Sequence, residues 1–371
     1  MPQSIPEMLA PTVINAVVSE LQVENTQFQN VFGGPFNGRA VDKGGRFFGW
    51  DVFNATREAA RGRAAGEPHG RRKAQKVDTV TGRFPRVAEG IELRYEEIHN
   101  QRRIGGPASE IDKRGADYIT RQEAFLKQVY SNHVEMQWAA MLRGKLFFTI
   151  NGDDLLPVLD EPASGEYETI DFRIPAANKL IGSSFAAGLD PLATGTNIIT
   201  ATWSNSGTDI PKQIYGIDEA MTVLSGFRLR HVFCRTSVWI NVLNNTAVRS
   251  LAGTAVQPFQ YVTQGESLGK ESFTAVLAGI PWVQWHVCNE VVTVDGSTVR
   301  LLPDDYCAFV PEPSAQWYEY WNGSEIVVPW VGMPAFEAYG PYFWAVPKAQ
   351  PAGYEIMGVH NGIPALTNPY A

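Results

Sequence analysis

The chain is poor in cysteine. Its 371 residues include only Cys234, Cys288 and Cys307, too few and too odd in number for a disulfide framework. We therefore expect a protein made in a reducing, intracellular compartment. Apolar runs are also short, and none approaches the ~18 residues of a membrane-spanning helix. The first basic residue is Arg39, so we expect no secretory signal. These features argue against a disulfide-rich secreted protein and a helical membrane protein.

Motifs of the common catalytic classes are missing, since the sequence has no GxSxG, HExxH or GxGxxG. The segment 265–271 (GESLGKE) is one residue too short for a phosphate-binding loop, and Glu271 stands where that loop needs Ser or Thr. These motifs therefore give no indication of a cofactor or of an enzymatic activity.

Two His/Cys pairs suggest a zinc site, namely His231 with Cys234 and His286 with Cys288. Structural zinc usually brings paired CxxC or HxxxH spacing, which these pairs lack. Both pairs lie in strand-like runs, where residues three apart point to opposite faces, although His286 and Cys288 share one. We favour core cysteines and edge histidines, and we expect no metal.

Two carboxylate pairs, Asp153-Asp154 and Asp304-Asp305, are the candidates for acid–base or metal chemistry. Both lie beside turn residues, and an acidic chain contains such pairs by composition alone. We interpret them as solvated loop corners. An α+β hydrolase that uses one of the pairs is the enzymatic alternative.

Charge is distributed unevenly. Residues 1–150 carry a net charge of +4, and residues 151–371 carry −12. This asymmetry predicts contact between the two halves, within one chain or between chains. It argues against a general nucleic-acid binder, which would show a concentrated basic surface. Gly and Pro make up about 16% of the chain, against ~12% on average, and favour strands and loops over a helical bundle.

The first hundred residues predict an arm and a hairpin. A short helix is expected over 12–21, followed by an extended arm through 33–35 that has too little apolar content to form its own core. The runs 47–53 and 76–87 are strand-like, and 91–98 alternates apolar and charged residues like a strand. A two-stranded ribbon is barely stable in water, so we expect both arm and hairpin to pack on a neighbouring subunit.

The predicted tip of the hairpin is strongly basic. It contains glycines but no interleaved aromatic residues for base stacking, so it favours contact with an acidic surface of another subunit over nucleic acid. The candidate inter-subunit contact residues are Arg57, Arg61, Arg63, Arg71, Arg72, Lys73 and Lys76.

The clearest predicted element is a helix over 109–143. Ser109 and Asp112 resemble a capping box, apolar residues recur at helical spacing, and Gly144 supplies the stop. Such a rod is about 50 Å long, whereas a compact chain of this size has a radius of gyration of roughly 21 Å. The helix therefore indicates an elongated or flat molecule. Further predictions are a helix over 211–228 and strands over 146–150, 167–174, 197–202, 230–234, 281–287, 306–311, 317–321 and 354–366.

Three stretches carry a resemblance to a known family. The first is residues 101–105 (QRRIG) before the long helix, with 142–145 (LRGK) at its exit. The second is 202–204 (TWS), followed by 210–211 (IP) and 217–218 (ID). The third is 302–305 (LPDD) with the closing 354–364 (YEIMGVHNGIP) and 368–369 (NP). In this order the chain resembles the tailed-phage major capsid proteins, within the family of the lambda major head protein E.

The resemblance implies an α+β fold of the Hong Kong 97 type. On that reading residues 1–38 are the N-terminal arm, 39–98 the extended β-hairpin loop, and 99–202 a peripheral domain with the long helix as its spine. Residues 203–335 would form the axial domain, and 336–371 would return to the peripheral domain.

The resemblance also implies a function. The chain would assemble with itself into pentamers and hexamers of an icosahedral shell that encloses double-stranded DNA. The packaged DNA would contact the shell only weakly and non-specifically. We expect a virion protein assembled in the host cytoplasm, a separate scaffold protein, possible binding of a decoration protein, and no membrane partner. The alternative of the same fold is the shell protein of a cellular nanocompartment.

Overall fold

The computed structural model describes residues 8–21, 23, 26–52, 77–100, 113–151, 154–179, 198–199, 201–253, 262–267, 272–277, 279–314, 316–328 and 334–369. The α-helices of this part are α2 (Pro11–Glu20), α3 (Gln27–Phe32), α4 (Tyr95–Asn100), α5 (Lys113–Arg143), α6 (Ile210–Ser225), α7 (Thr236–Asn244) and α8 (Thr246–Gly253). Two short 3-10 helices are η1 (Pro35–Asn37) and η2 (Ala176–Asn178). None of the described helices is long and apolar enough to cross a membrane.

The strands group into several sheets. The largest two run β1-β15-β19-β18, with β4 also paired to β19, and β14-β8-β11-β10-β9. The smaller ones are β6-β5-β7, β2-β3, β12-β13 and β16-β17. The bounds are β1 (Ala40–Asp42), β2 (Phe47–Val52), β3 (Asp78–Arg83), β4 (Arg86–Arg94), β5 (Lys145–Asn151), β6 (Asp154–Val158), β7 (Tyr167–Asp171), β8 (Leu229–Cys234), β9 (Val262–Ser267), β10 (Phe273–Leu277), β11 (Ile280–Val287), β12 (Val291–Val294), β13 (Ser297–Arg300), β14 (Cys307–Pro311), β15 (Tyr318–Asn322), β16 (Ser324–Val327), β17 (Phe336–Tyr339), β18 (Tyr342–Lys348) and β19 (Gly353–Leu366).

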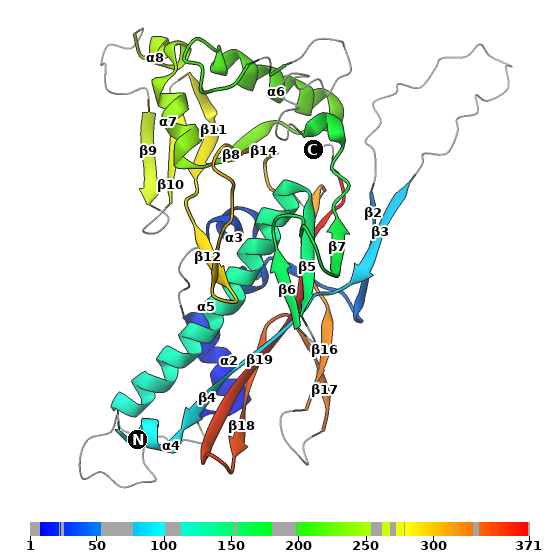
Figure 1. Cartoon of the computed structure of the whole chain (residues 1–371), viewed down its shortest axis with the longest axis vertical. Coiled ribbons are helices and arrows are strands. Elements are labelled where there is room, and N and C mark those ends of the chain that lie inside the picture. The colour runs from blue at the N-terminus through cyan, green and yellow to red at the C-terminus, as the bar shows by residue number, and fades with distance from the viewer. Residues whose placement is uncertain are drawn as a thin grey trace, which may run out of the picture.

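Helix α5 runs diagonally between the two large sheets (Figure 1). Its 31 residues correspond to about 46 Å. The helix ends as expected at Gly144, whose φ of 92° suits glycine and whose N–H bonds Ala140 O at 2.8 Å. The predicted capping box at Ser109 and Asp112 lies outside the described residues.

The sheet around β19 forms the lower part of the molecule in Figure 1. β19 is central because it pairs with β18 and β4 along its first part and with β15 along its last. Residues of α2, α5, β4, β18 and β19 enclose one hydrophobic core, which contains Ile14, Leu93, Tyr130, Phe343 and Ile356. Strand β15 belongs to this sheet although it falls inside the segment 203–335 expected to be axial.

The second large sheet lies at the other end of α5, with α6, α7 and α8 beside it (Figure 1). β8 and β11 are parallel neighbours at its centre. Helix α6 confirms the expected helix over 211–228, because Asp209 accepts a hydrogen bond from Lys212 N at 3.1 Å and Gly226 ends it at φ 86°. The core between this sheet and its helices contains Ile214, Val232, Trp239, Val283 and Trp285.

The arm differs from the expectation of an extended segment. Residues 27–32 form helix α3, whose Phe28 and Phe32 are buried in a third core between the two large sheets. The rings of both residues pack against Phe233 of β8, at centroid distances of 5.2 and 5.3 Å. The prediction that the arm needs a foreign surface is therefore wrong for α3, since aromatic residues four apart bury this helix in its own chain.

The hairpin is also anchored in its own chain. Along β2 the side chains alternate exposed and buried, which places Phe48, Trp50 and Val52 on one inward face. The Trp50 ring packs against Phe172 and Trp321, at centroid distances of 6.3 and 5.7 Å. The expectation that the ribbon needs a neighbour is thus wrong for its described base, and the tip at 53–76 lies outside the described residues.

The predicted strands over 76–87 and 91–98 differ from the elements in the structure. The run 76–87 is interrupted at Phe84 and Pro85, which separate β3 from β4. The expected strand over 91–98 ends at Arg94, and Tyr95–Asn100 forms helix α4. The alternation fails there because Ile98 is buried against α5 and β4 rather than in the sheet.

Candidate assembly surfaces

The long helix α5 holds the arm through two buried charged side chains. Glu135 is 1% exposed and accepts hydrogen bonds from Phe28 N and Gln29 N, both at 2.9 Å. These are N–H groups of the first turn of α3, which have no partner within the helix. Burial raises the pKa of Glu135 well above its usual range, and nearby Glu290 raises it further.

Lys127 anchors the other helix of the arm. Its ammonium group donates to Val18 O at 2.5 Å and to Leu21 O at 2.6 Å, at the C-terminal end of α2. A cation is favourable at that end, where the helix leaves unpaired carbonyls and partial negative charge. Burial lowers the pKa of Lys127. Lys127 and Glu135 lie eight residues apart on one helix, so they hold α2 and α3 along the same side of the spine.

The edge of the lower sheet is closed by the same arm. Asn15 of α2 donates to Phe343 O at 2.8 Å and accepts from Phe343 N at 3.0 Å. The side-chain amide thereby pairs with β18 as a neighbouring strand would. This contact blocks an edge that could otherwise template pairing with another chain.

The base of the hairpin is tied to the lower sheet by Glu325 of β16. Arg46 lies 3.3 Å from Glu325 Oε1, and Arg86 lies 3.5 Å from Oε2. Asn361 of β19 also donates to Oε2 at 2.9 Å. Glu325 is 9% exposed, so one nearly buried carboxylate connects the residue before β2, the start of β4, and β19.

A cleft of about 980 Å³ is lined by residues of the arm and by residues of β8 and β11 in the second large sheet, which is the upper sheet in Figure 1. His231 and His286 line it, and their Nδ1 and Nε2 atoms are 3.0 Å apart. Burial lowers the pKa of His231 to about 4 and that of His286 to about 3. The pair is therefore neutral at pH 7. The prediction of edge histidines is wrong, because β8 and β11 are internal strands.

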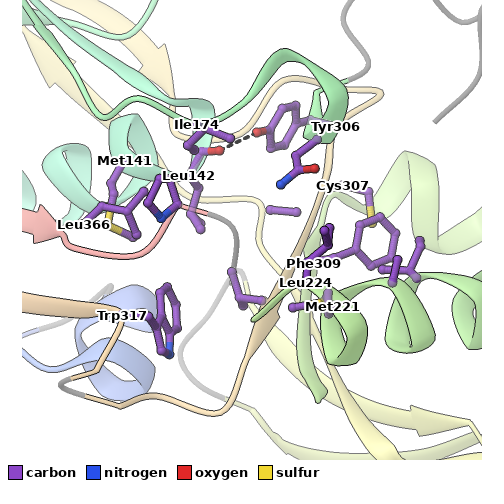
Figure 2. A pocket seen from close by; sticks show the side chains of 16 residues that line it. Met141, Leu142, Ile174, Met221, Leu224, Tyr306, Cys307, Phe309, Trp317 and Leu366 are labelled. Atoms are coloured by element: carbon purple, nitrogen blue, oxygen red, sulfur yellow. Dashed lines mark hydrogen bonds between the residues drawn. The ribbon is translucent and has the colours of Figure 1, made fainter. Parts of the chain in front are cut away.

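A smaller cavity of about 160 Å³ lies where the end of α5 meets α6 and β14 (Figure 2). Met141, Met221, Leu224 and Phe309 are among its lining residues, together with Cys307. Tyr306 closes one side by donating its hydroxyl to Leu142 O at 2.8 Å. The cavity thus lies between helix α5 and the upper unit, which consists of the sheet β14-β8-β11-β10-β9 and the helices α6, α7 and α8.

Exposed apolar side chains mark a third candidate surface. On the β16–β17 ribbon, Ile326 is 63% exposed, and Val328 just after β16 is 54% exposed. Phe47, at the base of the hairpin, is 75% exposed. Grouped apolar side chains on a protein surface commonly mark contacts with another protein.

Most of the candidate site residues named from the sequence lie outside the residues that the structure describes. The seven basic residues Arg57, Arg61, Arg63, Arg71, Arg72, Lys73 and Lys76 fall in the segment 53–76, which lies outside the described residues. Asp153 also lies outside the described residues. Asp304 pairs with Arg300 at 2.8 Å and with Arg235 at 2.7 Å, and both Asp304 and Asp305 are exposed, as expected of a loop corner. Within the described residues, no three His, Cys, Asp or Glu side chains are placed to hold a metal.

Sequence patterns missed Glu135, Lys127 and Glu325. A single charged residue in a predicted helix or strand is expected to be exposed to solvent. These three side chains are buried because segments distant in the sequence pack over them.

No protein-family model and no curated protein sequence matches the chain. Among solved structures, it is similar to a protein assigned as the capsid protein of a prophage of E. coli CFT073, with 14% identity and a TM-score of 0.54. That match covers 100% of this chain and 97% of the other. The chain has the Hong Kong 97 type capsid fold.

Two further structures show weaker similarity over most of their length. A phage-related protein of Bordetella bronchiseptica RB50 has 11% identity and a TM-score of 0.47, with 98% of this chain and 95% of the other covered. The capsid of Ralstonia phage GP4 has 11% identity and a TM-score of 0.41, with 99% and 87% covered.

The capsid fold of this chain should lose stability in acid, because its buried histidines are neutral. His360 is 1% exposed, its Nε2 lies 2.9 Å from the Tyr320 hydroxyl, and burial lowers its pKa to about 3. The unfolded chain takes up that proton near pH ~6.5. The stability that His360 contributes is therefore complete above pH ~6.5 and declines as the pH falls towards 3.

We expect His360→Gln to flatten this dependence by about 2 kcal/mol between pH ~6.5 and ~4.5. Urea unfolding of both proteins at several pH values measures it. Glu123 has a pKa raised by burial to about 7, so its contribution is lost as the pH rises, but it is common to both proteins and cancels in the difference. Parallel pH profiles for the two proteins would contradict the assignment.

Proposed function

We propose that this chain is a major capsid protein that assembles into pentamers and hexamers of an icosahedral shell around double-stranded DNA. The observation that carries the proposal is the full-length likeness of the fold to the protein assigned as a prophage capsid protein of E. coli CFT073. Rings form when one surface of a subunit binds a different surface of the next and the rotation closes. A subunit with a 31-residue helix and the β2–β3 ribbon at one side suits that kind of contact.

We assign the parts of the shell subunit as the sequence suggests. The upper unit around α6, β8 and β11 would be the axial domain that meets its copies at the shell vertices. The lower sheet with α5 would be the peripheral domain. The sequence assigns residues 39–98 to the extended hairpin loop, but β4 pairs with β19, so we would count β4 with the peripheral domain and limit the hairpin to residues 39–83. β15 pairs with β19 and would count with the peripheral domain.

The basic residues of the hairpin tip would make the inter-subunit contact. Arg57, Arg61, Arg63, Arg71, Arg72, Lys73 and Lys76 would dock on a neighbouring subunit, whose residues 151–371 carry the net charge of −12. Complementary charge of this kind directs encounter and register more than it adds affinity. The acidic second half would also let packaged DNA lie inside the shell without tight binding, because few cations are present to displace counterions.

The remaining partners follow from a shell function. A separate scaffold protein would guide assembly in the host cytoplasm, and a decoration protein is a further possible partner of the finished virion. The apolar residues around Ile326 and the exposed Phe47 provide surface for such protein contacts. We assign no cofactor, no membrane partner and no enzymatic activity to the chain.

Two alternatives are less well supported. A nanocompartment shell would share the fold, but the likeness with the highest TM-score given above is to a protein assigned to a prophage. A hydrolase would need a pair of carboxylates free to act, whereas Asp304 is held by Arg235 and Arg300.

Analytical ultracentrifugation tests the proposal. The chain would be expressed alone and together with its neighbouring genes, and each preparation would be sedimented at several concentrations. We expect rings or particles of many subunits in at least one preparation. A monomer or dimer at every concentration and in both preparations would contradict the proposed function.

A further inference from the structure

The three cysteines converge at one end of the upper sheet. Cys234 ends β8, and Cys307 begins β14 directly opposite it in the antiparallel register. Cys288 follows β11, and its N–H donates to Cys234 O at 2.8 Å. All three carry free thiols.

Only two of the three side chains share a face of the sheet. Cys234 is buried in the core with α6 and α7, and Cys307 packs against that same core. Cys288 belongs instead to the core on the other face, which also contains Phe233. This division follows from the alternation of side chains along neighbouring strands.

We propose that Cys234 and Cys307 are a site of disulfide formation that joins β8 to β14. Directly opposed residues on antiparallel strands have Cα atoms roughly 4.5–5.5 Å apart. A disulfide needs about 4.4–6.8 Å between the same atoms. The backbone register therefore meets the requirement without movement of either strand.

Cys307 is the more accessible of the two thiols. Cys307 lines the cavity at the end of α5 (Figure 2) and is only half-buried. Cys234 is fully buried. A small organic disulfide such as oxidised glutathione would first meet Cys307. The Cys307 thiolate attacks one sulfur of the oxidant, forms a mixed disulfide and releases one glutathione thiolate.

The Cys234 thiolate then attacks Sγ of Cys307. The protein disulfide forms as the bond to glutathione breaks, and the second glutathione thiolate leaves. The protein loses two protons and two electrons, which reduce one oxidised glutathione to two thiols. Burial raises the pKa of both cysteines, so few thiolates are present at neutral pH and the reaction accelerates in mild alkali.

The biological role of this disulfide rests on the proposed function. A shell made in a reducing cytoplasm and released into an oxidising medium would acquire this cross-link after assembly. The bond would constrain residues 235–306, which include most of the upper unit's sheet and the helices α7 and α8. Cross-links over long loops stabilise mainly by restricting the unfolded chain. The reaction itself does not depend on assembly and can be measured on the isolated chain.

The test is oxidation of the folded full-length protein by oxidised glutathione at about pH 8.5, followed by acid quenching, unfolding and alkylation of the remaining thiols. We expect the number of alkylated cysteines to fall from three to one, with peptide mapping that links Cys234 to Cys307. The oxidised protein should also melt higher than the reduced protein, by at least about 3 °C.

Three variants separate this pairing from the others. Cys288→Ser should still oxidise fully, and its melting temperature should rise on oxidation as that of the parent does. Cys234→Ser should stop at a glutathione adduct on Cys307, and Cys307→Ser should form neither adduct nor disulfide. A disulfide that involves Cys288, or three free thiols after prolonged oxidation of the folded parent, would overturn the proposal.

Discussion

Replacing Glu135 by Gln should lower the free energy of unfolding by about 2 kcal/mol and loosen the arm. The Glu135 carboxyl group accepts from both Phe28 N and Gln29 N. An amide offers only one acceptor oxygen and turns its NH₂ group towards the second N–H, so one buried donor loses its partner. Urea unfolding measures the loss of stability, and hydrogen exchange at the amides of Phe28 and Gln29 measures the loosening.

Glu123 provides the matched control. It lies on the same helix and is 3% exposed, but its pKa is raised to about 7 by burial alone. Glu123→Gln removes a poorly solvated charge, so we expect unchanged or slightly higher stability above pH 7 and unchanged protection of the two arm amides. Equal effects of the two substitutions, with both amides still protected in Glu135→Gln, would show that Glu135 does not hold α3.

The second large effect concerns assembly rather than folding. Replacing Arg71, Arg72 and Lys73 together with Glu should leave the subunit folded and abolish shell formation. The substitution changes the charge of the proposed contact by six, and like charges brought together at an interface cost several kcal/mol. Circular dichroism checks the fold, and light scattering after size-exclusion chromatography measures assembly.

The neutral variant with Gln at the same three positions separates repulsion from lost attraction. We expect it to assemble more slowly than the parent and to reach shells, and we expect the parent's assembly to slow as salt is raised. Normal particles from the triple Glu variant would exclude an electrostatic role of the tip.

The sequence predicted those helices and strands whose ends are determined by residues close to them in the chain. Helix α6 has its cap at Asp209 and its stop at Gly226, so its ends were correct within a few residues. The end of α5 was readable from Gly144 in the same way. Strands β8 and β11 were predicted because each is a short segment rich in β-branched and aromatic residues, and most of their residues are buried.

Elements that depend on distant partners were missed. Helix α3 has only six residues, and the acceptor for its first N–H groups is Glu135, more than a hundred residues away. The ribbon β16–β17 is set by its pairing register and by the Glu325 contacts. No local pattern identifies either one, because short elements draw their stability from tertiary packing.

The same limit applies to the candidate sites. Composition indicated a basic hairpin tip, and its contact with a neighbouring subunit remains a prediction. The contact between the His231 and His286 rings could not be predicted from the sequence. The parallel register of β8 and β11 brings these residues together although they are 55 positions apart. The opposition of Cys234 and Cys307 arises in the same way from the register of β8 and β14.

Negative-stain electron microscopy of the purified chain, expressed alone and with its neighbouring genes, tests the central claim most directly. A shell subunit should give closed particles of uniform diameter, or rings with five-fold and six-fold symmetry. Isolated single subunits in every preparation, at concentrations where the folded state is verified, would contradict the assignment as a capsid protein.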